Sequence, residues 1–195
     1  MSSPRTVARW VLDVAVLVAL VSAVVMAVSG NWDATIRFGV IAVVMVAVRT
    51  SDVPLPFAGA FAVLLLVSTW AAVRHWYRQI EHFDLLVHLL TPGSLAAVGY
   101  FFLVHQRLLP DARRQTPRLR SAAPVLWVVL VGTTAAVVWE FYEVVMEQLA
   151  PSSMNVGYTD TVLDLLAGML GSAVAGGLVL AWGRRSDTGP QRDGG

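Results

Sequence analysis

The chain has 195 residues, of which 56% are hydrophobic and 14% are charged, and its formal net charge is +1 at pH 7. A soluble domain has about 25% charged residues, so this deficit argues against a water-soluble protein and indicates that the bilayer is its solvent. The basic residues are scattered between apolar runs, which argues against a nucleic-acid partner. There is no cysteine, so disulfides and thiolate metal sites are excluded.

Six apolar segments predict six membrane-spanning helices. Most of them approach the ~20 residues that an α-helix needs to cross the hydrocarbon core. The second segment is short, and it requires Arg37 near one end to extend its side chain to the interface. The six segments are Val7–Val28, Ala34–Val48, Val53–Val73, Phe83–Val104, Ala122–Met146 and Thr161–Trp182. We therefore expect an all-α membrane protein with about six transmembrane helices in one bundle.

The polar ends of the chain predict two tails. Residues 1–6 and 184–195 are expected to be disordered, with residues 7–183 forming the transmembrane domain. A cleaved signal peptide is the alternative for the first segment, because Arg5 and Arg9 begin it and Ala27-Val28-Ser29 resembles a cleavage site. Its apolar stretch is longer than the ~7–15 residues of a signal peptide, which favours an uncleaved helix.

The arginines predict the orientation of the bundle. In a six-helix arrangement, four groups of arginines fall on the same side of the membrane. They lie at the start of the first segment, after the second, between residues 105 and 121, and after the last. The positive-inside rule makes that side cytoplasmic, so we expect both termini in the cytoplasm. Arg74 and Arg78 are exceptions, since they fall in an outer loop.

Charged residues gather at the start of the fourth segment, the end of the fifth and the start of the sixth. Such residues are rare inside membrane helices and face the bundle interior or a cavity. With alternating helix directions, all of these ends lie on the outer side of the membrane at one depth. We therefore expect one polar site there for a ligand or proton, made of Asp84, His88, Glu140, Glu143, Asp160 and Asp164.

Three further residues are expected to support this site. Thr91 extends the face of Asp84, Tyr142 supplies a hydrogen bond, and Arg37 lies at the same depth. The carboxylates still outnumber the basic groups, so they share protons, bind a cation or face a water-filled vestibule. Carboxylates with one imidazole suit a divalent metal such as Mg, Mn, Fe or Zn. The expected metal ligands are Asp84, His88, Glu140, Glu143 and Asp164.

Several of these features also have purely structural explanations. His88 alone is typical of a hydrogen-bonded core histidine, and Asp84 or Asp160 could cap a helix. The run Thr91-Pro92-Gly93-Ser94 predicts either a broken helix that lines a cavity or a simple proline kink. Gly168 and Gly171 belong to a small-residue pattern that favours close helix packing.

Three short motifs stand out in the second half of the chain: Asp84-Leu-Leu-Val-His88, Trp139-Glu140-Phe-Tyr-Glu143, and Tyr158-Thr-Asp160-Thr-Val-Leu-Asp164-Leu-Leu-Ala-Gly168. Over roughly Asp84 to Gly171, the chain resembles the YjdF-like and VanZ-like small bacterial membrane proteins. It departs from them at Leu85, where VanZ-like proteins tend to carry a basic residue, and at Asn155-Val-Gly-Tyr-Thr, where YjdF-like proteins are Gln-rich. The resemblance implies a multi-pass protein of the bacterial cytoplasmic membrane. VanZ-like proteins are linked to teicoplanin resistance, which suggests envelope lipids or cell-wall precursors.

The leading functional prediction is an outward-facing carboxylate–histidine site that binds a lipid or envelope ligand, with a divalent metal as a candidate cofactor. If the protein is an enzyme, Glu143 or Asp164 would act as base or metal ligand, and His88 as ligand or proton shuttle. The alternatives are a small proton- or cation-coupled transporter and a structural or assembly protein whose acids share protons between helices. The bilayer is the expected partner, and the oligomeric state is open.

Overall fold

The computed structural model describes residues 4–111, 122–149 and 157–187 of the chain. This part of the chain is helical, with no strand, as the apolar segments predict. The helices are α1 (Pro4–Val28), α2 (Trp32–Arg49), α3 (Leu55–Arg74), α4 (Trp76–Gln79), α5 (Phe83–His105), α7 (Ala123–Leu149) and α8 (Tyr158–Asp187).

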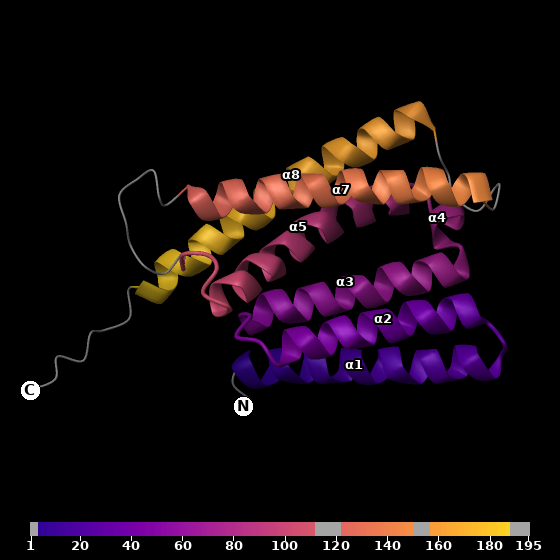
Figure 1. The fold of residues 1–195 in the computed structure, drawn as a ribbon, viewed down its shortest axis with the longest axis horizontal. Coiled ribbons are helices and arrows are strands. Elements are labelled where there is room, and N and C mark those ends of the chain that lie inside the picture. The colour runs from indigo at the N-terminus through magenta and orange to yellow at the C-terminus, as the bar shows by residue number, and fades with distance from the viewer. Residues whose placement is uncertain (1–3, 112–121, 150–156, 188–195) are drawn as a thin grey trace, which may run out of the picture.

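The long helices form two groups (Figure 1). Helices α1, α2 and α3 lie side by side, and α5, α7 and α8 form the second group, in which α8 crosses its neighbours obliquely. The main contact between the two groups is that of α3 with α5. The short helix α4 joins them at one end of the molecule, where α7 ends and α5 and α8 begin. We call this end the α4 end.

Five helices of the described part are long and apolar enough to cross a membrane. They correspond to α1, α3, α5, α7 and α8. The second predicted span forms α2, which has 18 residues and carries Asp33, Arg37 and Arg49, and it is not among the five. The chain is thus a membrane protein with several apolar helices, whereas six spans and cytoplasmic termini stay predictions.

The two ends of the helical part extend slightly beyond the predicted transmembrane domain. Helix α1 begins at Pro4, and α8 continues to Asp187. Both helices therefore include a few residues of the segments that are expected as tails. The rest of those tails, residues 1–3 and 188–195, lies outside the described residues.

Helices α5 and α8 approach each other closely through glycines. A Cβ atom on Gly93 would lie 2.7 Å from the carbonyl oxygen of Gly171. A Cβ atom on Gly171 would overlap the carbonyl oxygen of Leu89. Small residues let helix backbones come together in a bilayer, where there is little hydrophobic drive between helices. This contact brings the first turns of α5 and α8 side by side.

Helix α5 runs through Pro92 without a break. The broken-helix interpretation is therefore wrong for this segment, and the proline sits inside a continuous helix. Because proline has no N–H, the His88 carbonyl lacks its usual helical donor. Gly168 of α8 packs against this point, since a Cβ atom there would lie 3.6 Å from the His88 carbonyl oxygen.

Single cysteines can test the predicted orientation, because the chain has none of its own. Glu81 lies before α5, at the α4 end, and Gln106 lies just after it. In intact cells we expect a membrane-impermeant maleimide to label Glu81→Cys and not Gln106→Cys. The reverse pattern would invert the orientation, and labelling of both from outside would show that α5 does not span the membrane.

Candidate functional site

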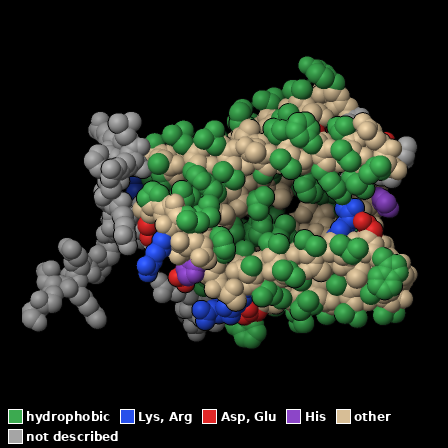
Figure 2. Space-filling model, in the orientation of Figure 1, with side chains coloured by type: hydrophobic (Ala, Val, Ile, Leu, Met, Phe, Trp, Pro, Cys, Tyr) green, Lys and Arg blue, Asp and Glu red, His purple; other side chains and the backbone are tan. Residues whose placement is uncertain are grey.

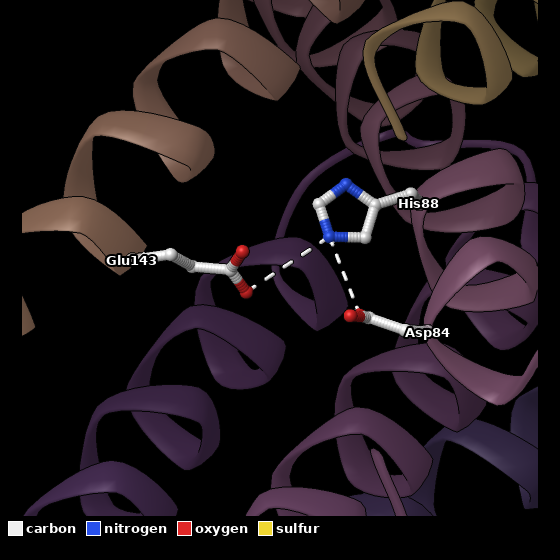
Figure 3. Close-up of side chains that lie close together, drawn as sticks. All are labelled: Asp84, His88 and Glu143. Carbon is white, nitrogen blue, oxygen red and sulfur yellow. Dashed lines mark ion pairs between the residues drawn. The ribbon is translucent and has the colours of Figure 1, made fainter. Parts of the chain in front are cut away.

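His88 lies at the centre of the polar residues at the α4 end, and its side chain is almost completely buried, with 2% exposed. Its Nε2 atom is 3.5 Å from an oxygen of Asp84 and 4.0 Å from an oxygen of Glu143 (Figure 3). Its Nδ1 atom is 3.5 Å from an oxygen of Glu140. The structure therefore brings Asp84 of α5 and Glu143 of α7 to one nitrogen of the imidazole ring, and Glu140 of α7 to the other.

Helix α8 adds two carboxylates to the cluster. Asp164 is buried, and Asp160 lies one turn before it. The potential ligand atoms form three groups, and within each group they lie within 4.8 Å of one another. These groups are Asp84, His88 and Glu143; His88, Glu140 and Asp164; and Asp84, Asp160 and Asp164. All six residues of the predicted site are thus neighbours.

Local sequence explains how each helix presents its acids. Asp84 and His88 are four residues apart on α5, and Glu140 and Glu143 are three apart on α7, so each pair shares one helix face. The Glu143 carboxylate is held by Trp139, whose Nε1 donates a hydrogen bond of 2.9 Å to it. The Trp139 ring also meets the His88 ring edge-on, with 6.3 Å between the ring centres.

Several buried polar atoms of the cluster have no hydrogen-bond partner within the described residues. These atoms are Nδ1 and Nε2 of His88 and one oxygen of Glu140. Thr91, predicted as a supporting residue, also has a buried hydroxyl without such a partner. A buried polar atom without a partner costs about 1–3 kcal/mol, so this arrangement favours an additional bound group among the carboxylates.

An open pocket of about 450 Å³ connects this cluster to the surface of the α4 end. Asp84 and Leu85 of α5 and Asp160, Leu163 and Asp164 of α8 form part of its wall. The rest of the wall is residues 77–82, from α4 and the turn after it. The pocket gives a polar ligand or an ion a path to the carboxylates from outside the bundle.

Arg37 is not a direct counter-ion of the cluster. Its Nε pairs with Asp33 on its own helix at 2.7 Å. Its guanidinium also interacts with Tyr142 of α7, the third predicted supporting residue. Tyr142 in turn packs on Trp139, with 5.9 Å between the ring centres. Arg37 and Tyr142 therefore border the site from the side of the first helix group.

Tyr77 of α4 is a neighbour of the site that sequence reasoning missed. Its hydroxyl donates a hydrogen bond of 3.2 Å to the carbonyl of Ser68. Burial, together with the nearby carboxylates of Asp84 and Glu143, raises the pKa of this hydroxyl well above its ordinary value. No motif places Tyr77 at the site, because a four-residue helix between two spans has no recognisable periodicity.

The apolar helices and the buried cluster at one end define a polytopic membrane protein with a polar site inside its bundle. A family model described as predicted membrane protein (DUF2238) matches residues 7–185. The chain therefore belongs to this family of predicted membrane proteins, which agrees with the expected membrane class. The finer resemblance to YjdF-like and VanZ-like proteins stays a prediction. No curated protein and no solved structure matches the chain.

Proposed function

We propose that this membrane protein binds a divalent metal ion at the carboxylate–histidine cluster of the α4 end, next to a site for a lipid or envelope ligand. One observation carries the proposal. A buried imidazole with no hydrogen-bond partner in the described chain is surrounded by carboxylates from three helices. Imidazole nitrogen and carboxylate oxygen together suit borderline and hard divalent ions.

The ligand set that we favour is Nε2 of His88 with Asp84 and Glu143. Ligands on opposite sides of an ion are about 4–5 Å apart when each bond is 2.0–2.6 Å long. The atoms of this group lie within 4.8 Å of one another, so an ion fits with small movements of the side chains. Nδ1 of His88 would then donate its hydrogen to Glu140, the arrangement that commonly orients metal-binding histidines.

A cation also explains how so many carboxylates are tolerated together. Buried carboxylates without partners are costly, and the paired Arg37 offers them no direct ion pair. A divalent ion among them offsets part of their repulsion. The third group, Asp84, Asp160 and Asp164, lines the open pocket and supplies oxygen ligands along the path from the surface.

A metal titration of the full-length protein tests this proposal. The protein is purified without a polyhistidine tag, stripped with chelator and titrated with Mn²⁺, and free Mn²⁺ is measured by EPR. We expect one saturable site per chain, and competition with Mg²⁺ or Zn²⁺ then ranks the preferred ion. The matched control is Glu81→Gln, which removes an acid that is 87% exposed at the pocket rim and should leave binding unchanged. Absence of saturable binding would refute the metal site.

Trp139→Phe should weaken the site without removing a ligand. The change deletes the N–H that orients Glu143 and keeps an aromatic ring at this position. Loss of such a supporting hydrogen bond lowers metal affinity about 10–100-fold, so we expect a Mn²⁺ dissociation constant raised about tenfold or more. Trp32→Phe, an exposed tryptophan on α2, is the control. Equal affinities in both variants would show that Trp139 does not orient a ligand.

A further inference from the structure

An arginine and several carboxylates line the same open pocket at the α4 end. Arg78 belongs to the part of the wall formed by residues 77–82, whereas Asp84, Asp160 and Asp164 belong to the part formed by α5 and α8. The α4 end is one of two ends at which charged side chains gather, with hydrophobic side chains over the part between (Figure 2). The pocket volume of about 450 Å³ is in the range of small-molecule sites, so the pocket has room for a ligand with charged groups.

Arg78 has no ion-pair partner in the part of the chain that the structure describes, although its side chain is exposed at this pocket. In contrast, Arg37 and Arg49 form ion pairs with aspartates. Arg74 lies over the ring of Trp70, 5.6 Å from its centre, as in a cation–π contact. Arg78 is also one of the two exceptions to the predicted orientation. An anion in the pocket is a partner that suits its charge.

A metal ion at the proposed site borders this pocket. Asp84 belongs both to the favoured ligand set and to the pocket wall. The protein supplies three ligands to this ion, Nε2 of His88 and one oxygen each of Asp84 and Glu143. An octahedral ion such as Mg²⁺ takes six ligands, and proteins commonly hold it with one or two carboxylates together with the phosphates of a ligand. The remaining positions are therefore open to oxygen atoms of a molecule in the pocket.

The charges of the pocket favour a phosphate group that binds together with the ion. Asp160 and Asp164 line the pocket and repel a bare anion, so the cation is needed for the anion to bind. A guanidinium binds two phosphate oxygens in a forked geometry. A phosphate monoester has three non-ester oxygens, one for the ion and two for the fork. A carboxylate has only two oxygens and cannot satisfy both groups in this way.

We propose that the pocket binds a phosphate monoester group, with one oxygen on the metal ion and two on the guanidinium of Arg78. The inference rests on the proposed metal site and names the chemistry of the ligand beside it. Inorganic phosphate has the oxygens of this group, and so does the headgroup of a phospholipid such as phosphatidic acid. The experiment therefore uses both as probes.

Equilibrium dialysis of the full-length protein in a phosphate-free detergent tests this inference. The protein is either loaded with one Mn²⁺ per chain or stripped with chelator, and the probes are ³²P-labelled inorganic phosphate and dihexanoyl phosphatidic acid. We expect at least one probe to bind the loaded protein about tenfold or more tightly than the stripped protein. The tighter probe then identifies a free phosphate or a lipid headgroup as the ligand. Equal binding with and without Mn²⁺, or no binding of either probe, would overturn the inference.

Arg78→Gln then locates the phosphate. We expect a loss of about tenfold in probe affinity, the factor given by one charge-assisted hydrogen bond. Its Mn²⁺ affinity without phosphate should not fall, because the change removes a positive charge near a cation site. The matched control is Arg74→Gln, the same change at an arginine outside the pocket wall, which should bind the probes normally. Equal probe affinities in the two variants would refute the inferred position.

Arg78→Lys separates charge from geometry. Lysine keeps the positive charge but lacks the planar fork, so this variant must lose part of the probe affinity. Wild-type probe affinity in Arg78→Lys would exclude the forked contact with phosphate.

Failure of the metal site and failure of the phosphate site give different results. Absence of saturable Mn²⁺ binding overturns both proposals. Saturable Mn²⁺ binding without metal-dependent binding of either probe overturns the phosphate site alone and leaves the metal site standing.

Discussion

Replacing His88 by alanine is expected to lower the Mn²⁺ affinity at least about 100-fold, beyond the effect of losing a supporting hydrogen bond. The reason is its position. His88 is the imidazole shared by two of the three ligand groups, and Asp84, Glu140 and Glu143 all lie within 4.0 Å of its ring nitrogens. Without it, the favoured site keeps two carboxylates and no nitrogen ligand. The EPR titration described above measures the change.

His82→Ala is the matched control for this experiment. His82 is exposed at the pocket rim, and the same substitution there should leave the affinity unchanged. Circular dichroism and size-exclusion chromatography establish that both variants remain folded. If His88→Ala disturbs the helices, His88→Gln fills more of the same space with a neutral polar side chain. Wild-type Mn²⁺ affinity in a folded His88 variant would exclude this residue as a ligand.

Gly171→Leu is expected to have the largest effect on stability. A Cβ atom at this position would overlap the backbone carbonyl oxygen of Leu89, which no side-chain rotation can relieve. Helices α5 and α8 must then move apart, which we expect to cost more than about 3 kcal/mol, the upper part of the range for overpacked cores. Because α8 also carries Asp160 and Asp164, the site would open as well. Thermal denaturation in detergent, followed by size-exclusion chromatography, measures the loss.

Gly177→Leu is the control on the same helix. No atom lies within 4 Å of a Cβ atom at Gly177, so the larger side chain faces open space and should change the melting temperature little. A melting temperature of Gly171→Leu equal to that of Gly177→Leu would contradict the close approach of α5 and α8.

Much of the fold is predictable because the signals are local. Runs of apolar residues long enough for a bilayer predict the long helices, and the helices α1, α3, α5, α7 and α8 occupy those runs. Helix α2 also forms, although its charged residues keep it from being one of the five helices that are apolar enough to cross a membrane. Local patterns did not reveal whether α5 continues through Pro92, because that depends on how α8 packs against the freed carbonyl of His88.

The depth of the candidate site in the membrane was predictable, but the contacts between its residues were not. Alternating helix directions place the acids of three helices at one end, whatever the angles between helices. The position of Asp164 near His88 depends on the close α5–α8 contact, and that of Glu143 depends on Trp139. Arg37 pairs locally with Asp33, four residues away, instead of reaching the carboxylates, and Tyr77 lies in a helix too short to predict.

Electron spin echo modulation of bound Mn²⁺ tests the metal site most directly, because it reports nitrogen atoms bonded to the ion. The full-length wild type is loaded with one Mn²⁺ per chain, in parallel with His88→Gln loaded at higher Mn²⁺ concentration. We predict ¹⁴N coupling from one imidazole in the wild type and its loss in the variant. Bound Mn²⁺ without ¹⁴N coupling in the wild type, or coupling that persists in His88→Gln, would contradict a metal held by His88.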